Sequence, residues 1–139
     1  MTQLSGKQNI EFRTLFDVND LNRGRGEMRE IVWDFVEGAV GLKTCEIIYI
    51  ESLRHNIIFH TRGGEYHIYM PLKEIMKMLE SSGFIRIHRS YIVNPGCMKI
   101  VKNYETILDN GTRLPISKAK YKEVKALYRL DLSRGAGQP

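Results

Sequence analysis

Phe84-Ile-Arg-Ile-His-Arg-Ser-Tyr-Ile-Val-Asn94 is the stretch of this sequence that decides how the rest of the chain is interpreted. It mixes apolar residues that are fit for burial with polar side chains that form hydrogen bonds. A protein core does not hold an unpaired arginine, so Arg89 is expected at the surface. Arginine can bind the major-groove edge of guanine with two hydrogen bonds, and asparagine can bind adenine in the same way. Asn94 has a second interpretation, because Asn-Pro-Gly at 94–96 is typical of a turn.

Strand patterns dominate the sequence on either side of this stretch. Short apolar runs at 46–50 and 56–61 predict two strands. Gly63-Gly64 follows the second run and predicts a tight turn into a third strand at 66–69, because glycine supplies the positive φ that such turns need.

A further hairpin is predicted between 105–108 and 112–116, because the Asn-Gly pair between them is a strong hairpin signal. Residues 28–40 are ambiguous, since their apolar positions fit both the stripe of a helix and one face of a strand. Trp33 is assigned to the core under either interpretation. The fold class is therefore mainly β.

Two helices accompany the predicted strands. Pro71 suits the first turn of one helix and Gly83 its end, and apolar residues between them recur at i, i+3, i+4 and i+7. Ser117 is a favourable N-cap for the second helix, whose lysines are expected to face mostly outward. The inward-facing residues of this second helix are predicted to be Tyr121, Val124, Leu127 and Tyr128.

Length and composition fit one folded domain with extensions. The chain has 139 residues, of which 42% are hydrophobic, so a core can form. Residues 1–27 are polar and are predicted to form a linker or flexible extension. Residues 28–132 are predicted to form the domain, and 133–139 a disordered tail.

No apolar run approaches the length needed to cross a bilayer, and no charged-then-apolar signal segment opens the chain. We therefore expect a soluble, cytoplasmic protein with no membrane partner. In a reducing compartment, Cys45 and Cys97 are expected to be small buried or half-buried residues that form no disulfide.

Positive charge is unevenly distributed along the chain, whose net charge is +5. Residues 84–103 contain four Arg or Lys and no acid, and residues 113–129 contain six basic residues against one acid. Such clustering is typical of a surface that binds a polyanion. The alternative is a solvated surface whose balancing acids lie nearby in the fold.

Signatures of catalysis and of metal binding were not found in the sequence. It has neither a P-loop nor a Gly-x-Ser-x-Gly elbow. Its four histidines are scattered; His60 and His67 could face each other across a hairpin, but no Cys or acid is placed to complete a metal site. We expect no enzymatic activity, no metal and no cofactor.

At 84–94 the sequence closely resembles the central motif of LytTR domains, a family of bacterial DNA-binding regulators, which typically reads Phe-x-Arg-x-His-x-Ser-Tyr-x-Val-Asn. Residues 46–51 are similar to the family's Asp/Glu-Ile-x-Tyr-Ile-Glu strand, and residues 108–118 to its terminal hairpin. These blocks occur in order and cover about residues 40 to 130. Several correctly spaced blocks make the resemblance specific.

The resemblance implies elongated, stacked β-sheets with one or two short helices, and loops that enter successive major grooves of DNA. By position, the family's base contacts fall on His55, Arg89 and Lys118, and Arg54 could take the role of His55. A wider set of polar residues in or near these loops is also predicted to bind DNA. These residues are Asn56, Arg86, His88, Ser90, Asn94, Lys99, Lys102, Ser117, Lys120 and Lys122.

The resemblance also implies sequence-specific binding of double-stranded DNA and regulation of transcription, as the output domain of a two-component response regulator. Such regulators usually bind tandem half-sites as two protomers, so a homodimer on DNA is expected. The chain has no room for the usual receiver domain, so either its control lies elsewhere or it is a fragment. The alternative function is a protein-interaction module whose basic loops bind an acidic partner. Single-strand RNA binding would need exposed aromatic residues, for which only Tyr66 and Tyr69 are candidates.

Overall fold

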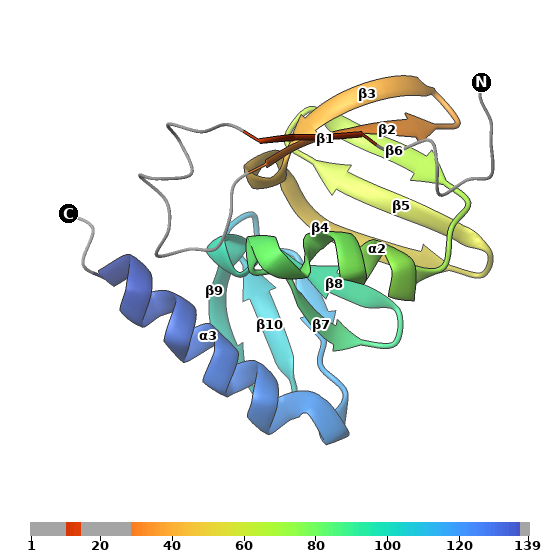
Figure 1. Cartoon of the computed structure of the whole chain (residues 1–139). Helices are drawn as coiled ribbons and strands as arrows, with labels where there is room; N and C mark the ends of the chain where they lie inside the picture. The colour runs from red at the N-terminus through yellow and green to blue at the C-terminus, as the bar shows by residue number, and fades with distance from the viewer. Residues whose placement is uncertain (1–10, 15–28, 137–139) are drawn as a thin grey trace.

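The computed structural model describes residues 11–14 and 29–136 (Figure 1). Nearly half of these residues belong to three sheets whose paired strands are antiparallel, which confirms the mainly β fold class. Within the two described ranges, no helix combines enough length with enough apolar side chains to span a membrane.

The described part of the ambiguous segment, residues 29–40, forms strands. β2 (Arg29–Phe35) and β3 (Gly38–Lys43) pair as a hairpin, with Gly38 at a φ of 134°. Trp33 is fully buried, as predicted, whereas Val36, which a helical stripe would bury, is 62% exposed. The buried residues are therefore those that share one face of a strand, and the helical spacing does not explain which residues are buried.

The central sheet has five strands. They are β4 (Ile47–Leu53), β5 (Asn56–Thr61), β6 (Gly64–Ile68), β7 (Ile85–His88) and β8 (Tyr91–Val93). Their order in the sheet is β6-β5-β4-β8-β7. The predicted hairpin across the glycine pair is confirmed as β5 and β6.

A smaller sheet contains the second predicted hairpin. β9 (Met98–Lys102), β10 (Glu105–Leu108) and β11 (Arg113–Pro115) are arranged with β10 in the middle. Gly111 has a φ of 90° in the turn between β10 and β11, where the sequence predicted an Asn-Gly hairpin. Glycine adopts this left-handed conformation without steric cost.

The first helix forms where the apolar spacing predicts it. α2 (Leu72–Leu79) has Pro71 at its N-cap and continues into a 3-10 turn at Glu80–Ser82. Gly83 ends the turn with a φ of 88°, which is the usual role of glycine after a helix.

The second helix, α3 (Tyr121–Ala136), begins after a 3-10 turn at Lys118–Lys120. Ser117 occupies the predicted N-cap position, at the start of this 3-10 turn, but its side chain makes no capping hydrogen bond. Val124 is buried as predicted, whereas Leu127 is 38% exposed. The helix extends through the first part of the tail that was predicted to be disordered, and 137–139 lie outside the described residues.

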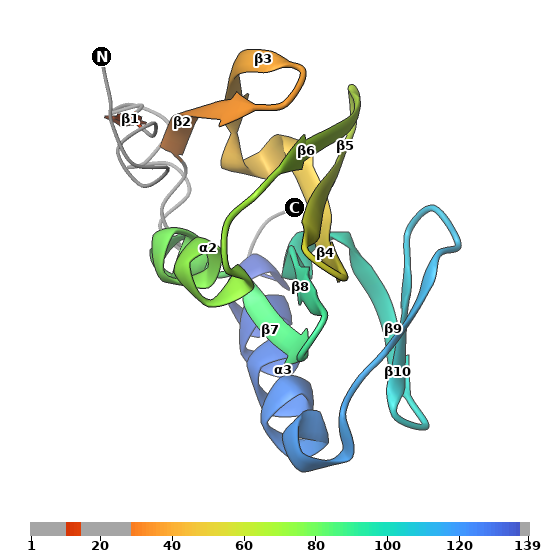
Figure 2. The same ribbon diagram turned by 90° about the vertical axis from the view of Figure 1, so that its right-hand side faces the viewer.

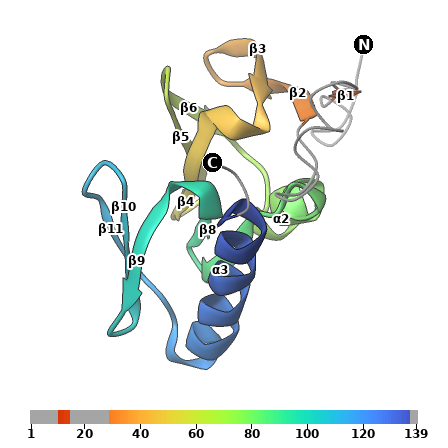
Figure 3. The ribbon, with the colours of Figure 1, turned by 90° about the vertical axis from the view of Figure 1, so that its left-hand side faces the viewer.

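Two hydrophobic cores lie on opposite faces of the central sheet, so the sheets are stacked in layers, as expected (Figure 2). The first core joins β2, β3 and α2 to one face, and Phe59 packs there against Trp33 with ring centroids 4.7 Å apart. The second core joins the other face to β9–β11 and α3. The Tyr128 hydroxyl donates hydrogen bonds to the carbonyl oxygens of Met98 and Lys99, at 3.0 and 3.1 Å, which holds α3 against β9 (Figure 3).

The described part of the N-terminal segment is also a strand. β1 (Glu11–Thr14) pairs with β2, so these four residues belong to a sheet, and the rest of the predicted linker lies outside the described residues. Both cysteines are free, as predicted. Cys97 is buried but Cys45 is exposed, so the prediction of burial is wrong for Cys45.

Candidate nucleic-acid interface

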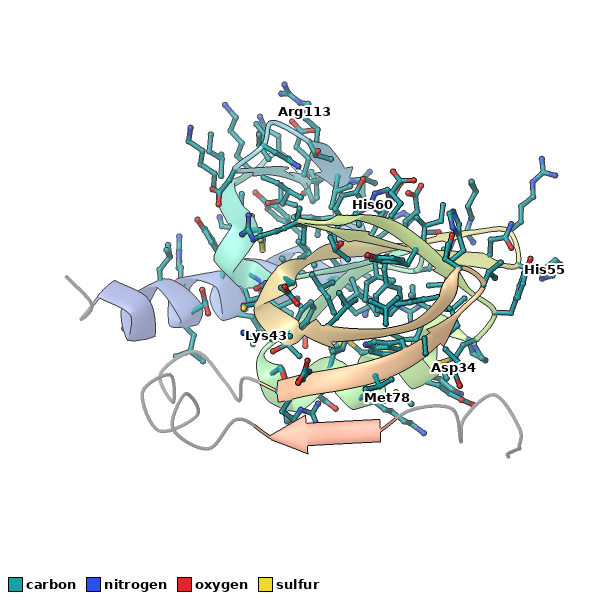
Figure 4. The ribbon with its side chains drawn as sticks, turned by 90° about the horizontal axis from the view of Figure 1, so that it is seen from above. Asp34, Lys43, His55, His60, Met78 and Arg113 are labelled. Atoms are coloured by element: carbon teal, nitrogen blue, oxygen red, sulfur yellow. The ribbon has the colours of Figure 1, made fainter. Side chains whose placement is uncertain are left out.

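The turn between β4 and β5 is formed by Arg54 and His55. Arg54 has a φ of 61°, which allows the chain to reverse within two residues. Arg54, His55 and Asn56 are all exposed, and His55 extends away from the end of the sheet (Figure 4). Both predicted alternatives for the first base contact, His55 and Arg54, are therefore accessible.

The turn between β7 and β8 is formed by Arg89 and Ser90. Arg89 is exposed, and its guanidinium has no hydrogen-bond or ion-pair partner among the described residues. A free, planar guanidinium at a loop tip is suited to bidentate binding of a base or a phosphate. The surface position predicted for Arg89 is confirmed.

The third predicted base contact, Lys118, is exposed where the chain passes from β11 into α3. The residue before it, Ser117, is half-buried, and its backbone N–H donates to the carbonyl oxygen of Ile87 at 3.0 Å. Because Ile87 is on β7, this hydrogen bond attaches the Lys118 loop beside the Arg89 turn.

A second backbone hydrogen bond attaches the His55 loop to the same turn. The N–H of Ser52, near the end of β4, donates to the carbonyl oxygen of Ser90 at 2.8 Å. The β4–β5 turn, the β7–β8 turn and the start of α3 therefore follow one another along one side of the molecule (Figures 1 and 2). The structure brings the three predicted base-contacting residues, which are far apart in the sequence, to this side. We call this row of loops the loop side.

Several residues of this wider set instead bind other parts of the protein. Asn94 donates from its amide nitrogen to the carbonyl oxygen of Ile47 and accepts from the N–H of Gly96, both at 3.0 Å. The turn interpretation of Asn94 explains these contacts, which direct its side-chain amide toward backbone groups of the protein. Arg86 and His88 are likewise hydrogen-bonded within the β7–β8 turn.

His88 is held in its neutral form by its surroundings. Burial is the largest cause that lowers its pKa, and the positive charges of Arg89 and Arg86 lower the pKa further. A neutral imidazole can accept a hydrogen bond, and Nδ1 of His88 accepts one from the N–H of Ser90 at 3.1 Å. His88 therefore contributes structure to the loop side, and its lowered pKa disfavours a positive charge there.

The lysine candidates are spread over β9, the 3-10 turn before α3, and α3 itself. Lys99 and Lys102 are exposed on β9. Lys122 is exposed on α3, and Lys120 is half-buried in the turn before it. These side chains supply positive charge without the fixed geometry of the loop tips, which suits contacts to phosphate better than contacts to bases.

Residues 37–129 match the family model described as the LytTr DNA-binding domain, which is more than half of the chain. The chain belongs to the LytTR family. Among its relatives, the sensory transduction protein LytT of Bacillus subtilis is 31% identical over 99 residues, which are 68% of this chain and 41% of the relative. The transcriptional regulatory protein LytR of Staphylococcus aureus (strain N315) is 36% identical over 90 residues, which are 61% of this chain and 37% of the relative.

A solved LytTR domain shares the fold. The LytTr DNA-binding domain of a putative methyl-accepting/DNA response regulator from Bacillus cereus superimposes with a TM-score of 0.61 at 22% identity. The match covers 70% of this chain and 94% of the solved one. This chain spans about two fifths of the length of the LytT and LytR relatives.

Two histidines of this LytTR domain are each hydrogen-bonded to a different acid. His60 is hydrogen-bonded to Glu51 at 2.8 Å, and His67 is hydrogen-bonded to Glu37, so the two histidines do not face each other as considered from the sequence. Among the described residues, no group of three or more His, Cys, Asp or Glu side chains is arranged so that it could hold a metal ion.

The two aromatic candidates for single-strand binding differ in exposure. Tyr66 is half-buried and stacks on Phe35 with ring centroids 5.0 Å apart, whereas Tyr69 is 67% exposed. One exposed ring does not make the stacking platform that single-strand binding uses.

Ser52 is the residue of the loop side that the sequence did not reveal. Its contribution is a backbone N–H that joins two loops. Every residue except proline has such a group, so no local sequence signal could have identified Ser52.

Proposed function

We propose that this chain binds double-stranded DNA in a sequence-specific way and regulates transcription through it. The loops of the loop side enter successive major grooves, and two protomers occupy tandem half-sites as a homodimer on DNA. In a longer protein the domain serves as the output domain of a two-component response regulator.

The observation that supports this proposal is the pair of backbone hydrogen bonds that set three loops side by side, Ser52 to Ser90 and Ser117 to Ile87. Each loop presents an exposed donor, which is His55 or Arg54, Arg89 or Lys118. The names of the LytT and LytR relatives, which describe sensory transduction and transcriptional regulation, agree with this role.

The basic side chains divide into two roles. Arg89, Lys118 and either His55 or Arg54 select bases, because hydrogen bonds to base edges distinguish one sequence from another. Lysines away from the tips, such as Lys122, neutralise phosphates and supply affinity that is independent of sequence and falls with salt.

The test is to select bound duplexes from a random pool and to compare a selected duplex with random duplex at fixed salt. The selected duplex should bind on the order of a thousandfold more tightly. Arg89→Ala should weaken binding to the selected duplex by about 1 to 3 kcal/mol and change random binding by no more than one lost charge. The matched control, Lys122→Ala, should weaken binding to both duplexes alike and reduce the salt slope by about one unit.

The alternative is a module that binds an acidic protein, which the basic charge of the loop side also permits. In that case wild-type chain would show no preference among duplexes, and Arg89→Ala and Lys122→Ala would weaken random and selected binding equally. Either result would contradict the proposal.

A further inference from the structure

The turn that carries Arg89 is held by a side chain outside it. Arg86, on β7, donates from Nε to the carbonyl oxygen of His88 at 3.2 Å and from Nη2 to that of Arg89 at 2.7 Å. These carbonyls belong to the two peptide groups that flank the Cα of Arg89. Because a guanidinium is a rigid planar fork, the two hydrogen bonds together fix the backbone orientation of Arg89.

Other hydrogen bonds hold the remaining residue of the turn. The N–H of Ser90 donates to Nδ1 of His88 at 3.1 Å, and the carbonyl oxygen of Ser90 accepts from Ser52 at 2.8 Å. The ring of His88 lies 5.7 Å from the ring of Tyr91. The backbone from His88 to Ser90 is therefore fixed before any ligand arrives.

A fixed turn matters for recognition of a base. The two hydrogen bonds of an arginine to guanine require the guanidinium to be placed within about 0.5 Å, which a mobile loop does not achieve. A loop that is already ordered also loses less conformational entropy on binding.

We infer that Arg86 is a positioning residue, which contacts no DNA and holds the β7–β8 turn so that the Arg89 guanidinium meets a base. This inference rests on the proposed function. It assigns Arg86 a role different from the direct DNA contact that the sequence predicted.

Arg86→Lys is the decisive variant, because it keeps the charge but replaces the planar fork with a single ammonium group. Binding to the selected duplex should weaken about tenfold. Binding to random duplex should change less than about twofold, and the salt slope should stay the same, because no charge is lost. Arg113→Lys is the matched control, since Arg113 is exposed on another hairpin and bonds to Glu105 at 3.1 Å (Figure 4). This control should bind both duplexes like the wild type.

The same substitution in an Arg89→Ala background separates positioning from contact. Arg86→Lys should then cause no further loss on the selected duplex, because there is no guanidinium left to position. A tenfold loss that persists without Arg89, an equal loss on both duplexes, or no loss at all would overturn the inference.

Amide hydrogen exchange measures the turn without DNA. The Ser90 N–H should exchange faster in Arg86→Lys than in wild-type protein, while amides of the buried β4 and β5 strands stay protected. Unchanged Ser90 exchange, even with weakened binding, would overturn the inference and leave the proposed function standing. A wild-type chain that prefers no duplex would instead refute the proposed function, and with it the role of Arg86.

Discussion

Asn94→Ala separates the two interpretations of Asn94, as a turn residue or as a base contact. In the structure its amide nitrogen donates to the carbonyl oxygen of Ile47, a residue with no exposed surface, and its side-chain oxygen caps the turn at Gly96. Loss of the first bond leaves a buried carbonyl without this donor, and loss of the second removes a cap, so the free energy of unfolding should fall by about 2 kcal/mol. The melting temperature should fall by roughly 10 °C.

Urea unfolding followed by the fluorescence of Trp33, the only tryptophan, measures the change in stability. Asn110→Ala is the matched control, because Asn110 accepts one hydrogen bond from Thr112 in an exposed turn, and its loss should cost less than about 1 kcal/mol. At a temperature where all variants are folded, Asn94→Ala should bind the selected duplex like the wild type. The reasoning is refuted if Asn94→Ala is as stable as the wild type but binds the selected duplex more than tenfold more weakly.

Two further predictions concern His88 and the cysteines. Burial, Arg89 and Arg86 lower the pKa of His88 from its usual 6.5, so the unfolded chain binds this proton more tightly and stability should fall as the pH falls below 6.5. The urea midpoint should therefore drop more between about pH 7.5 and pH 5 in wild-type protein than in His88→Gln, and equal drops would contradict the cause. Under native conditions a thiol reagent should modify Cys45 rapidly and Cys97 only after unfolding, because Cys97 is 3% exposed; rapid reaction of both thiols would contradict the burial.

The sequence by itself determined most of the local structure. Turn residues with one physical role, such as Gly83 and Gly111, were placed correctly because glycine adopts a positive φ without steric cost. The apolar spacing of α2 and the strand patterns around the central motif were sufficient to predict these elements. A helix or strand that buries one face must repeat its apolar residues at a regular interval. The surface positions of His55, Arg89 and Lys118 followed from the cost of burying charge or from the family resemblance.

Where the apolar residues fitted both a helical and a strand spacing, only the tertiary structure determined which element forms. Residues 29–35 became a strand because the core on one face of the central sheet accepts Trp33, and Val36 was left exposed. The sequence could not identify β1, whose partner strand supplies the backbone hydrogen bonds that make it a strand.

The loop side is a tertiary feature as well. The hydrogen bonds of Ser52 and Ser117 join loops that come from distant parts of the chain, and they use backbone groups that carry no sequence signal. The role of Arg86 also depends on tertiary structure. Its charge allowed a contact to DNA, and only the positions of the His88 and Arg89 carbonyls show that its guanidinium binds the turn. Residue chemistry fixed what each side chain can do, and the fold determined which partner it meets.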